Sequence, residues 1–307
     1  MAFIHRAVMH PSKVKQQFGA QLKSLSASQS PHRVFSDWLE IAAITLHQLP
    51  YHSGELAKDS AFETLEAQYM ERIKAHDREN LFSFSEMLSL LIMAHNGSYG
   101  DFLGDIAGEY ELLNKHVGQF FTPYHLCRLL AKMSIGDVRS LVEEKGIITV
   151  CEPAVGAGGL VIATAEEAAS QGVDPRAYIQ FDCTDVSRDA FNMAYIQLSA
   201  LGLQAVVRHG NTLSGEYWEH RPTPQLRMFE QWLAPRRKEQ RLIQAMRSVL
   251  AGTCPAEPEA WDSPPVYETT SGQTLFDLEQ FAREPLTKKR LPKKPDVVLD
   301  RQMDLFG

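Results

Sequence analysis

The chain has 307 residues and a formal net charge of −7, with 44% hydrophobic and 22% charged residues. This composition is typical of a soluble globular protein with one large or two modest domains. No apolar run approaches the roughly 20 residues needed to span a bilayer, and residues 1–10 lack the apolar stretch of a secretory signal, so we expect a cytoplasmic protein that does not enter a membrane.

Residues 1–112 read as a helical N-terminal domain, because long β-branched runs are absent and apolar residues recur at helical spacing. Ser30 followed by Pro31 predicts one helix start, and a second helix is expected from Ala61 to Lys74. A third helix is expected to begin at Ser83, where Ser-x-x-Glu forms a capping-box pattern, and to end at Asn96-Gly97.

The next segment, Gly118-Gln-Phe-Phe-Thr-Pro, leads into another expected helix. Thr122 suits the N-cap and Pro123 the first helical position, so this helix should run from Pro123 to about Met133. Phe120 and Phe121 stand directly before the cap. They are either a hydrophobic staple that packs in the core or an aromatic wall for a flat ligand.

A strand, a tight turn and a helix are predicted at residues 147–169. The apolar run Ile147-Ile-Thr-Val meets Glu152 and then three glycines before an alanine-rich stretch. Glycine tolerates positive φ and lets a ligand lie against the backbone, while the first turn of a helix offers unpaired N–H groups. The pattern fits either a nucleotide-sized pocket or an ordinary connection in an α/β domain.

Two further strands bring polar residues to the same edge of the predicted sheet. Tyr178 to Cys183 forms one strand that ends near Asp185, where a doubly wound sheet places a carboxylate for ribose hydroxyls. A helix from Arg188 to Leu201 follows, and then a third strand, Ala205 to Arg208, leads to Asn211. Three polar loops after successive strands therefore converge beside the glycines.

The cysteines give no support for a metal or a disulfide framework. Cys127, Cys151, Cys183 and Cys254 are far apart, with no Cys-x-x-Cys pair and no histidine at metal-ligand spacing. We therefore expect reduced, mostly buried thiols and no metal site.

Four motifs, in order and spacing, carry a resemblance to a known family. They are Gly118-Gln-Phe-Phe-Thr-Pro, Glu152-Pro-Ala-Val-Gly-Ala-Gly-Gly, Asp185 with its helix, and Gly210-Asn-Thr-Leu. Over about residues 100–215 the chain resembles S-adenosylmethionine-dependent N6-adenine DNA methyltransferases, above all the modification subunits of type I restriction systems. The resemblance implies a Rossmann-like α/β methyltransferase sheet, possibly truncated, after a helical domain.

What the resemblance implies about function is adenine N6 methylation of DNA, with S-adenosylmethionine as the cofactor. DNA is the expected partner, together with a specificity subunit or a second methyltransferase subunit. Phe120, Thr122 and Pro123 would border the methionine end of the cofactor. The full set of implied cofactor-binding residues is Phe120, Phe121, Thr122, Pro123, Glu152, Pro153, Gly156, Gly158, Asp185 and Asn211.

Individual roles follow from the same resemblance. Glu152 would compensate the methionine ammonium, Gly156 and Gly158 would lie under the cofactor, and Asp185 would hold the ribose. Asn211 stands where the family usually has an aspartate that accepts from the adenine amino group. An amide carbonyl still accepts a hydrogen bond but carries no charge, so a modest loss of cofactor affinity is expected.

The family's catalytic segment, Asp/Asn-Pro-Pro-Phe/Tyr, is not found in this chain, and no catalytic residue is assigned. Its amide or carboxylate would accept the hydrogens of the target amino group, and its aromatic ring would stack on the flipped base. Arg221-Pro-Thr-Pro, Ser263-Pro-Pro-Val-Tyr and the strand-like Pro295-Asp-Val-Val-Leu-Asp each match it only in part. The chain is therefore either an enzyme or a catalytically inactive cofactor- or DNA-binding relative with a regulatory or anti-restriction role.

The last third of the chain divides into two expected parts after a cofactor-binding domain at residues 113–220. Residues 221–252 predict a helix with a basic side, which is either a solvated surface or a phosphate contact, and residues 253–307 form a proline-rich tail. Near the end, Gln302-Met-Asp-Leu-Phe resembles the short bacterial motif that binds the replicative sliding clamp. Gln302, Leu305 and Phe306 would make that contact, unless the two apolar residues fold back on the sheet.

Overall fold

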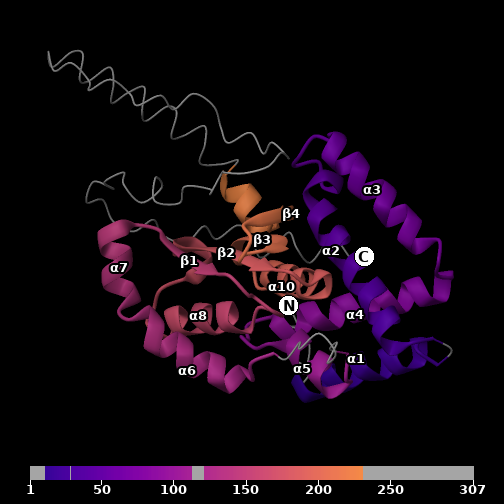
Figure 1. The fold of residues 1–307 in the computed structure, drawn as a ribbon, viewed down its shortest axis with the longest axis horizontal. Helices are drawn as coiled ribbons and strands as arrows, with labels where there is room; N and C mark the ends of the chain where they lie inside the picture. The colour runs from indigo at the N-terminus through magenta and orange to yellow at the C-terminus, as the bar shows by residue number, and fades with distance from the viewer. Residues whose placement is uncertain (1–10, 28, 113–120, 231–307) are drawn as a thin grey trace, which may run out of the picture.

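The computed structural model describes residues 11–27, 29–112 and 121–230. The first two of these ranges are helical in their regular parts, as the sequence predicts (Figure 1). Their helices are α1 (Pro11–Leu25), α2 (Pro31–His52), α3 (Ser60–Ile73), α4 (Arg78–His95) and α5 (Phe102–Glu109).

Two of the expected helix starts are confirmed and one is wrong. Helix α2 begins after Ser30 with Pro31 in its first turn, and α3 begins one residue before the expected position. Helix α4 begins at Arg78, not at Ser83, because the Asp77 carboxylate accepts from the Asn80 N–H and caps the helix further toward the N-terminus. Two patterns of capping residues stood close together in the sequence, and the aspartate is the one that caps.

The rest of the described chain alternates helices and strands. After α6 (Tyr124–Ile135) and α7 (Val138–Lys145) come β1 (Ile148–Glu152), α8 (Gly159–Ser170), α9 (Pro175–Tyr178), β2 (Ile179–Asp185), α10 (Arg188–Ala200), β3 (Gln204–Asn211) and β4 (Glu216–Pro222). Residues 224–230 are helical. The strands expected from residues 147, 178 and 205 are confirmed as β1, β2 and β3.

The four strands form one sheet in the order β1-β2-β3-β4. The first three are parallel, with Val150 opposite Phe181 and Phe181 opposite Ala205, and helices connect them. This arrangement is the Rossmann-like α/β fold expected from the sequence. The parallel strands all end at the same edge, which brings the loops after β1, β2 and β3 together.

Strand β4 is antiparallel to β3 and was not predicted. Its sequence, Glu-Tyr-Trp-Glu-His-Arg-Pro, is polar, and its first three residues are exposed. A strand that lacks a buried apolar face gives no alternating hydrophobic pattern, so periodicity misses it. The strand also runs across the boundary that the sequence placed between residues 220 and 221.

The helices of residues 11–112 and the sheet share one hydrophobic core. Phe18 and Trp38 belong to the same buried cluster as Phe181 and Val207 of the sheet. Helix α2 packs against α10, which lies in the centre of the molecule beside the sheet (Figure 1). The division of the chain into separate domains stays a prediction.

A buried ion cluster fastens α2 to the sheet. We call Glu40, Arg188, Asn192, Glu219 and Arg221 the Glu40 cluster. The Glu40 carboxylate accepts from Arg188 at 2.6 and 2.9 Å, from Asn192 at 2.9 Å and from Arg221 at 3.3 Å. Glu219 of β4 accepts from both arginines. A charge on α2 thereby holds residues that lie about 150 to 180 positions later in the chain.

The Glu40 cluster predicts a loss of stability in acid. Burial alone would raise the pKa of Glu40, but the hydrogen bond from Arg188 and the charges of Arg221 and Arg188 lower it to about 2. Because the folded pKa lies below the unfolded one, near 4.5, the stabilisation is complete above pH 4.5 and is lost as the pH falls toward 2. Urea midpoints measured between pH 6 and pH 2.5 should fall, and the variant Glu40→Gln should show a smaller fall.

No helix among residues 11–27, 29–112 and 121–230 is long and apolar enough to cross a membrane. Cys127 and Cys183 are buried free thiols, and Cys151 is an exposed one. Cys254 lies outside the described residues.

Candidate functional site

The turn after β1 has the backbone that its glycines predict. We call residues 153–159 the glycine turn. Gly156 and Gly158 have φ values of 57° and 101°, which lie in the region that side chains disfavour. The Val155 N–H donates to the Thr184 carbonyl at 2.9 Å, so the turn is fixed to the end of β2. Helix α8 begins at Gly159, the last residue of this turn, with Gly158 at its N-cap.

Asp185 at the end of β2 is joined to the glycine turn. Its Oδ2 accepts from the Gly156 N–H at 2.8 Å, and its Oδ1 accepts from the Ser187 N–H at 2.9 Å. Each carboxylate oxygen has a second lone pair, so two acceptor positions remain beyond these two bonds. The partly exposed side chain thus fixes the turn and still presents a negative charge at the edge of the sheet.

Phe121 lies against the turn as the sequence suggested. A Cβ atom built on Gly156 would come within 3.0 Å of the Phe121 ring, so the ring covers the glycine backbone. The side chain is partly buried, which makes it a wall of the site that also packs on the core. Phe120, its predicted partner, lies outside the described residues.

The start of α6 differs by one position from the prediction. Helix α6 begins at Tyr124 with Pro123 at the N-cap position, and no side chain caps it, so Thr122 is not the N-cap. The Thr122 carbonyl instead accepts from the Cys127 thiol at 3.5 Å. Proline fixes the φ of the cap residue and needs no N–H there, which explains the shift. Thr122 and Pro123 are exposed beside Phe121.

The loop after β3 contacts the loop after β1. The Thr212 hydroxyl donates to the Pro153 carbonyl at 2.7 Å. Asn211 lies at the end of β3, and its amide oxygen accepts from the Leu213 N–H at 3.0 Å. That oxygen therefore shapes its own turn, while the amide N–H₂ makes no hydrogen bond to the part of the chain that the structure describes. Glu152 behaves similarly, since its carboxylate accepts from the Ala154 N–H at 3.1 Å.

Two exposed apolar residues lie at this edge of the sheet, and they were not assigned to the site from the sequence. Val186, next to Asp185, is 61% exposed, and Leu213, two residues after Asn211, is 99% exposed. Covering such side chains with a ligand is favourable by about 25 cal/mol per Å² of apolar surface removed from water. They were detectable as the apolar residues that follow each polar strand end, and they offer faces for a flat apolar group.

Six predicted residues therefore meet at one edge of the sheet, from the loops after β1, β2 and β3 and from the segment before α6. They are Phe121, Glu152, Pro153, Gly156, Asp185 and Asn211. Gly158 follows two residues after Gly156 and faces α10, because a Cβ atom built on it would lie 3.6 Å from the Cα of Ala194. The set combines acceptors, a bare backbone and apolar surface, which suits a nucleoside with a charged substituent.

Arg221, the first residue of one partial match to the catalytic segment, is unsuited to a role in chemistry. Its side chain is 1% exposed and is engaged in the Glu40 cluster. Arg227, assigned to a basic helix side, is also engaged, because its guanidinium donates to the His47 carbonyl at 2.9 Å and lies over the Tyr51 ring. Arg221 is therefore not available for a phosphate or a base, and Arg227 already has partners within the fold.

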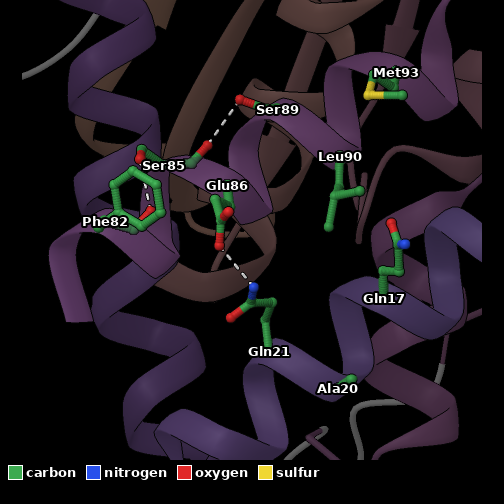
Figure 2. A pocket seen from close by; sticks show the side chains of 9 residues that line it. All are labelled: Gln17, Ala20, Gln21, Phe82, Ser85, Glu86, Ser89, Leu90 and Met93. Carbon is green, nitrogen blue, oxygen red and sulfur yellow. Dashed lines mark hydrogen bonds between the residues drawn. The ribbon is translucent and has the colours of Figure 1, made fainter. Parts of the chain in front are cut away.

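A separate hollow of about 710 Å³ lies on the helical part, between α1 and α4 (Figure 2). Its charged lining residue is Glu86, which accepts from Gln21 at 2.7 Å. Ser85 and Ser89 donate to backbone carbonyls one turn earlier in their own helix. Neither serine hydroxyl of the hollow is hydrogen-bonded to a side chain that could act as a base, and none of the lining residues lies at a strand end. We therefore place the candidate site at the glycine turn.

No group of histidine, cysteine, aspartate or glutamate residues suited to a metal ion occurs in the described part of the chain. The predicted clamp-binding residues Gln302, Leu305 and Phe306 lie outside that part. So do the partial matches to the catalytic segment at residues 263–267 and 295–300. Those assignments stay predictions.

The chain is similar to known proteins over part of its length. Residues 98–232 match the family described as N-6 DNA Methylase, and over that range the chain resembles N6-adenine DNA methyltransferases. A type I restriction-modification methyltransferase subunit from Streptococcus thermophilus is 14% identical, covers 69% of this chain and 60% of its own, and has a TM-score of 0.39. A protein from Listeria monocytogenes, described as a class I S-adenosylmethionine-dependent methyltransferase, is 15% identical, with coverages of 67% and 55% and a TM-score of 0.33. This chain thus spans about 60% and 55% of those two chains. No curated protein sequence matches significantly.

Proposed function

We propose, from the premise that residues 98–232 carry an N-6 DNA methylase domain, that this chain binds S-adenosylmethionine at the glycine turn and acts in adenine N6 methylation of DNA, alone or as a subunit. The observation that carries the proposal is the bond of Asp185 to Gly156 beneath the Phe121 ring, inside the range that the family matches. The cofactor would supply an activated methyl group, and the glycine turn would form part of its binding site.

The residues of the site fit such a cofactor. Asp185 keeps acceptor positions for ribose hydroxyls, and Val186 and Leu213 offer apolar faces for the adenine ring. Glu152 stands at the end of β1, where its charge favours an ammonium group. The N–H₂ of Asn211 can donate to a ring nitrogen, which differs from the accepting role expected from the sequence.

Replacing Asp185 by alanine should weaken S-adenosylmethionine binding by about one to two orders of magnitude, because a charged hydrogen bond of about 1.5–3 kcal/mol is lost at the ribose and the turn loses one of its hydrogen bonds to β2. Titration calorimetry measures the change. Asp182→Ala is the matched control. Asp182 lies on the same strand, but its carboxylate accepts a hydrogen bond of 2.8 Å from Arg208 and does not contact the turn.

DNA affinity separates the two possible causes of a loss in Asp185→Ala. Binding to DNA should stay unchanged in this variant. An equal loss of cofactor and DNA binding would point to a folding defect and would remove Asp185 from the site. Cofactor binding that survives Asp185→Ala unaltered would mean that the pocket lies elsewhere.

Methyl transfer itself is tested with purified protein, labelled S-adenosylmethionine and DNA of mixed sequence. Label in DNA, recovered as N6-methyladenine, supports an enzyme. Cofactor binding without label favours a subunit that needs a specificity or second methyltransferase partner. Co-expression with such a subunit and analysis of host DNA then decides between a subunit and an inactive protein.

The alternative is a catalytically inactive relative with a regulatory or anti-restriction role. One observation favours it, because the partial catalytic match at Arg221 is taken up by the Glu40 cluster. In that case the chain binds cofactor or DNA, and host DNA gains no N6-methyladenine when the gene is expressed with its neighbouring subunits.

A further inference from the structure

One glutamine side chain links the glycine turn to the N-terminal helices. Gln197 of α10 is fully buried. Its amide nitrogen donates to the Ala157 carbonyl at 2.7 Å and to Oδ1 of Asp101 at 2.8 Å. Ala157 lies between the two glycines of positive φ, so the bond from Gln197 to Ala157 holds the middle of the turn.

The oxygen of the same amide is bound to α4 and α5. It accepts from the Leu103 N–H at 3.0 Å and lies 3.2 Å from Nε2 of His95. Two acceptors, Asp101 and Ala157, require the N–H₂ group on one side, and the Leu103 N–H requires the oxygen on the other. The orientation of the amide is therefore determined by its neighbours, and all four of its hydrogen-bonding positions are used.

The three partners on the helical side, Asp101, Leu103 and His95, are themselves buried. His95 is 5% exposed, and burial lowers its pKa to about 4 despite the hydrogen bonds to Gln197 and Ser98. It is neutral at pH 7, and its Nε2 faces the Gln197 oxygen. Asp101 caps α5 by accepting from the Gly104 N–H at 2.9 Å, and burial raises its pKa.

Asp101 also touches the start of α8. A Cβ atom built on Gly159 would come within 2.9 Å of Oδ2 of Asp101, so the carboxylate lies against the last residue of the glycine turn. The N-terminus of a helix favours a negative charge. The turn is thus held by Asp185 from β2 and by Gln197 and Asp101 from the side of α4, α5 and α10, which lie together in Figure 1.

We propose that Gln197 is a positioning residue that sets the shape of the glycine turn, and that it makes cofactor binding depend on the seating of α4 and α5. The inference rests on the proposed function for its effect on S-adenosylmethionine, but its effect on the turn is independent of any ligand. Gln197 does not touch the outer face of the turn, where the ligand would lie, so it acts through Ala157.

The decisive variant is Gln197→Met, which keeps the length of the side chain and removes all four hydrogen bonds. The matched control is Gln180→Met. Gln180 is 2% exposed, lies near the start of β2, five residues before Asp185, and donates to the Gln204 side chain at 3.0 Å. Both variants place an apolar chain in a buried polar site, but only one of these glutamines contacts the turn.

Amide hydrogen exchange of residues 155–159 in the ligand-free protein is the first measurement. Exchange should accelerate about tenfold in Gln197→Met, equivalent to about 1.4 kcal/mol, and should stay near the wild-type rate in Gln180→Met. Titration with S-adenosylmethionine should show an affinity loss of about tenfold in the first variant and less than about twofold in the control.

His95→Leu provides a milder second variant if Gln197→Met fails to fold. It removes one partner of Gln197 on α4 and no atom that contacts the turn, so it tests the link itself. Exchange at residues 155–159 should rise by about threefold. Equal exchange at the turn in Gln197→Met and Gln180→Met, or in His95→Leu and wild type, would overturn the inference.

The exchange measurement also keeps the two proposals apart. If the wild-type protein does not bind S-adenosylmethionine, the proposed function fails, while faster exchange at the turn in Gln197→Met alone still supports the positioning role. If the wild type binds the cofactor and Gln197→Met binds it equally well, the proposed function stands and the positioning role is wrong.

Discussion

Replacing Gly156 by valine is expected to abolish S-adenosylmethionine binding, with a loss of affinity of about 100-fold or more. The residue has a φ of 57°, where a β-branched side chain is a severe outlier, and its Cβ would lie 3.0 Å from the Phe121 ring. A left-handed residue costs about 1–2 kcal/mol, and displacement of the ring or of the Gly156–Asp185 bond adds to that cost. A shift that relieves this strain moves the backbone on which the cofactor would lie, and a 100-fold loss of affinity corresponds to about 2.7 kcal/mol.

Gly97→Val separates loss of the pocket from general strain. Gly97 has a φ of 77° at the end of α4, and a Cβ atom built there meets nothing within 4 Å. Both variants should lower the melting temperature by a few degrees, on the order of 1–2 kcal/mol. Only Gly156→Val should lose the cofactor in titration calorimetry. Unchanged affinity in Gly156→Val would show that the glycine turn is not the cofactor-binding site.

The second large effect is expected at Glu40. Glu40→Ala should lower the free energy of unfolding by about 3–5 kcal/mol, because it leaves Arg188 and the 1% exposed Arg221 without the carboxylate that they share. Folded domains are stable by only about 5–15 kcal/mol, so this single change brings the protein close to unfolding. Urea denaturation followed by circular dichroism measures it.

Two comparisons make the Glu40 result specific. Glu71→Ala removes an exposed glutamate on α3 and should cost less than about 0.5 kcal/mol. The double variant Glu40→Met with Arg221→Met removes both an acid and a base from the cluster and should be less damaging than the loss of Glu40 alone. A cost below about 1 kcal/mol for Glu40→Ala would mean that the arginines find other partners.

The sequence predicts the glycine turn and Asp185 well, because local chemistry determines both. Positive φ needs glycine, and a carboxylate directly after a parallel strand can only lie at one edge of the sheet. The three parallel strands were also predicted, each within a few residues of its observed bounds. The resemblance assigned Phe121 to the cofactor site, while the residues alone left open whether the ring packs on the core, and the structure shows that it does.

The unpredicted features depend on contacts between distant parts of the chain. Strand β4 is polar, and its pairing with β3 and the Glu40 cluster stabilise it, so no local pattern indicates it. The role of Gln197 is equally invisible, because its partners on α4 and α5 lie about 100 residues earlier. Asn211 was assigned by its place in a motif, and the sequence did not reveal that its oxygen closes its own turn.

The strand order has a consequence for how the protein is made. Each strand of the sheet lies beside the one that precedes it in the chain, so a growing chain on the ribosome can add β2, β3 and β4 in turn to an edge that already exists. Arg221 then meets Glu40, which was synthesised 181 residues earlier. Arg227 meets His47 next, so we expect the last long-range contacts of the described fold to form only after residues 221–227 have left the ribosome.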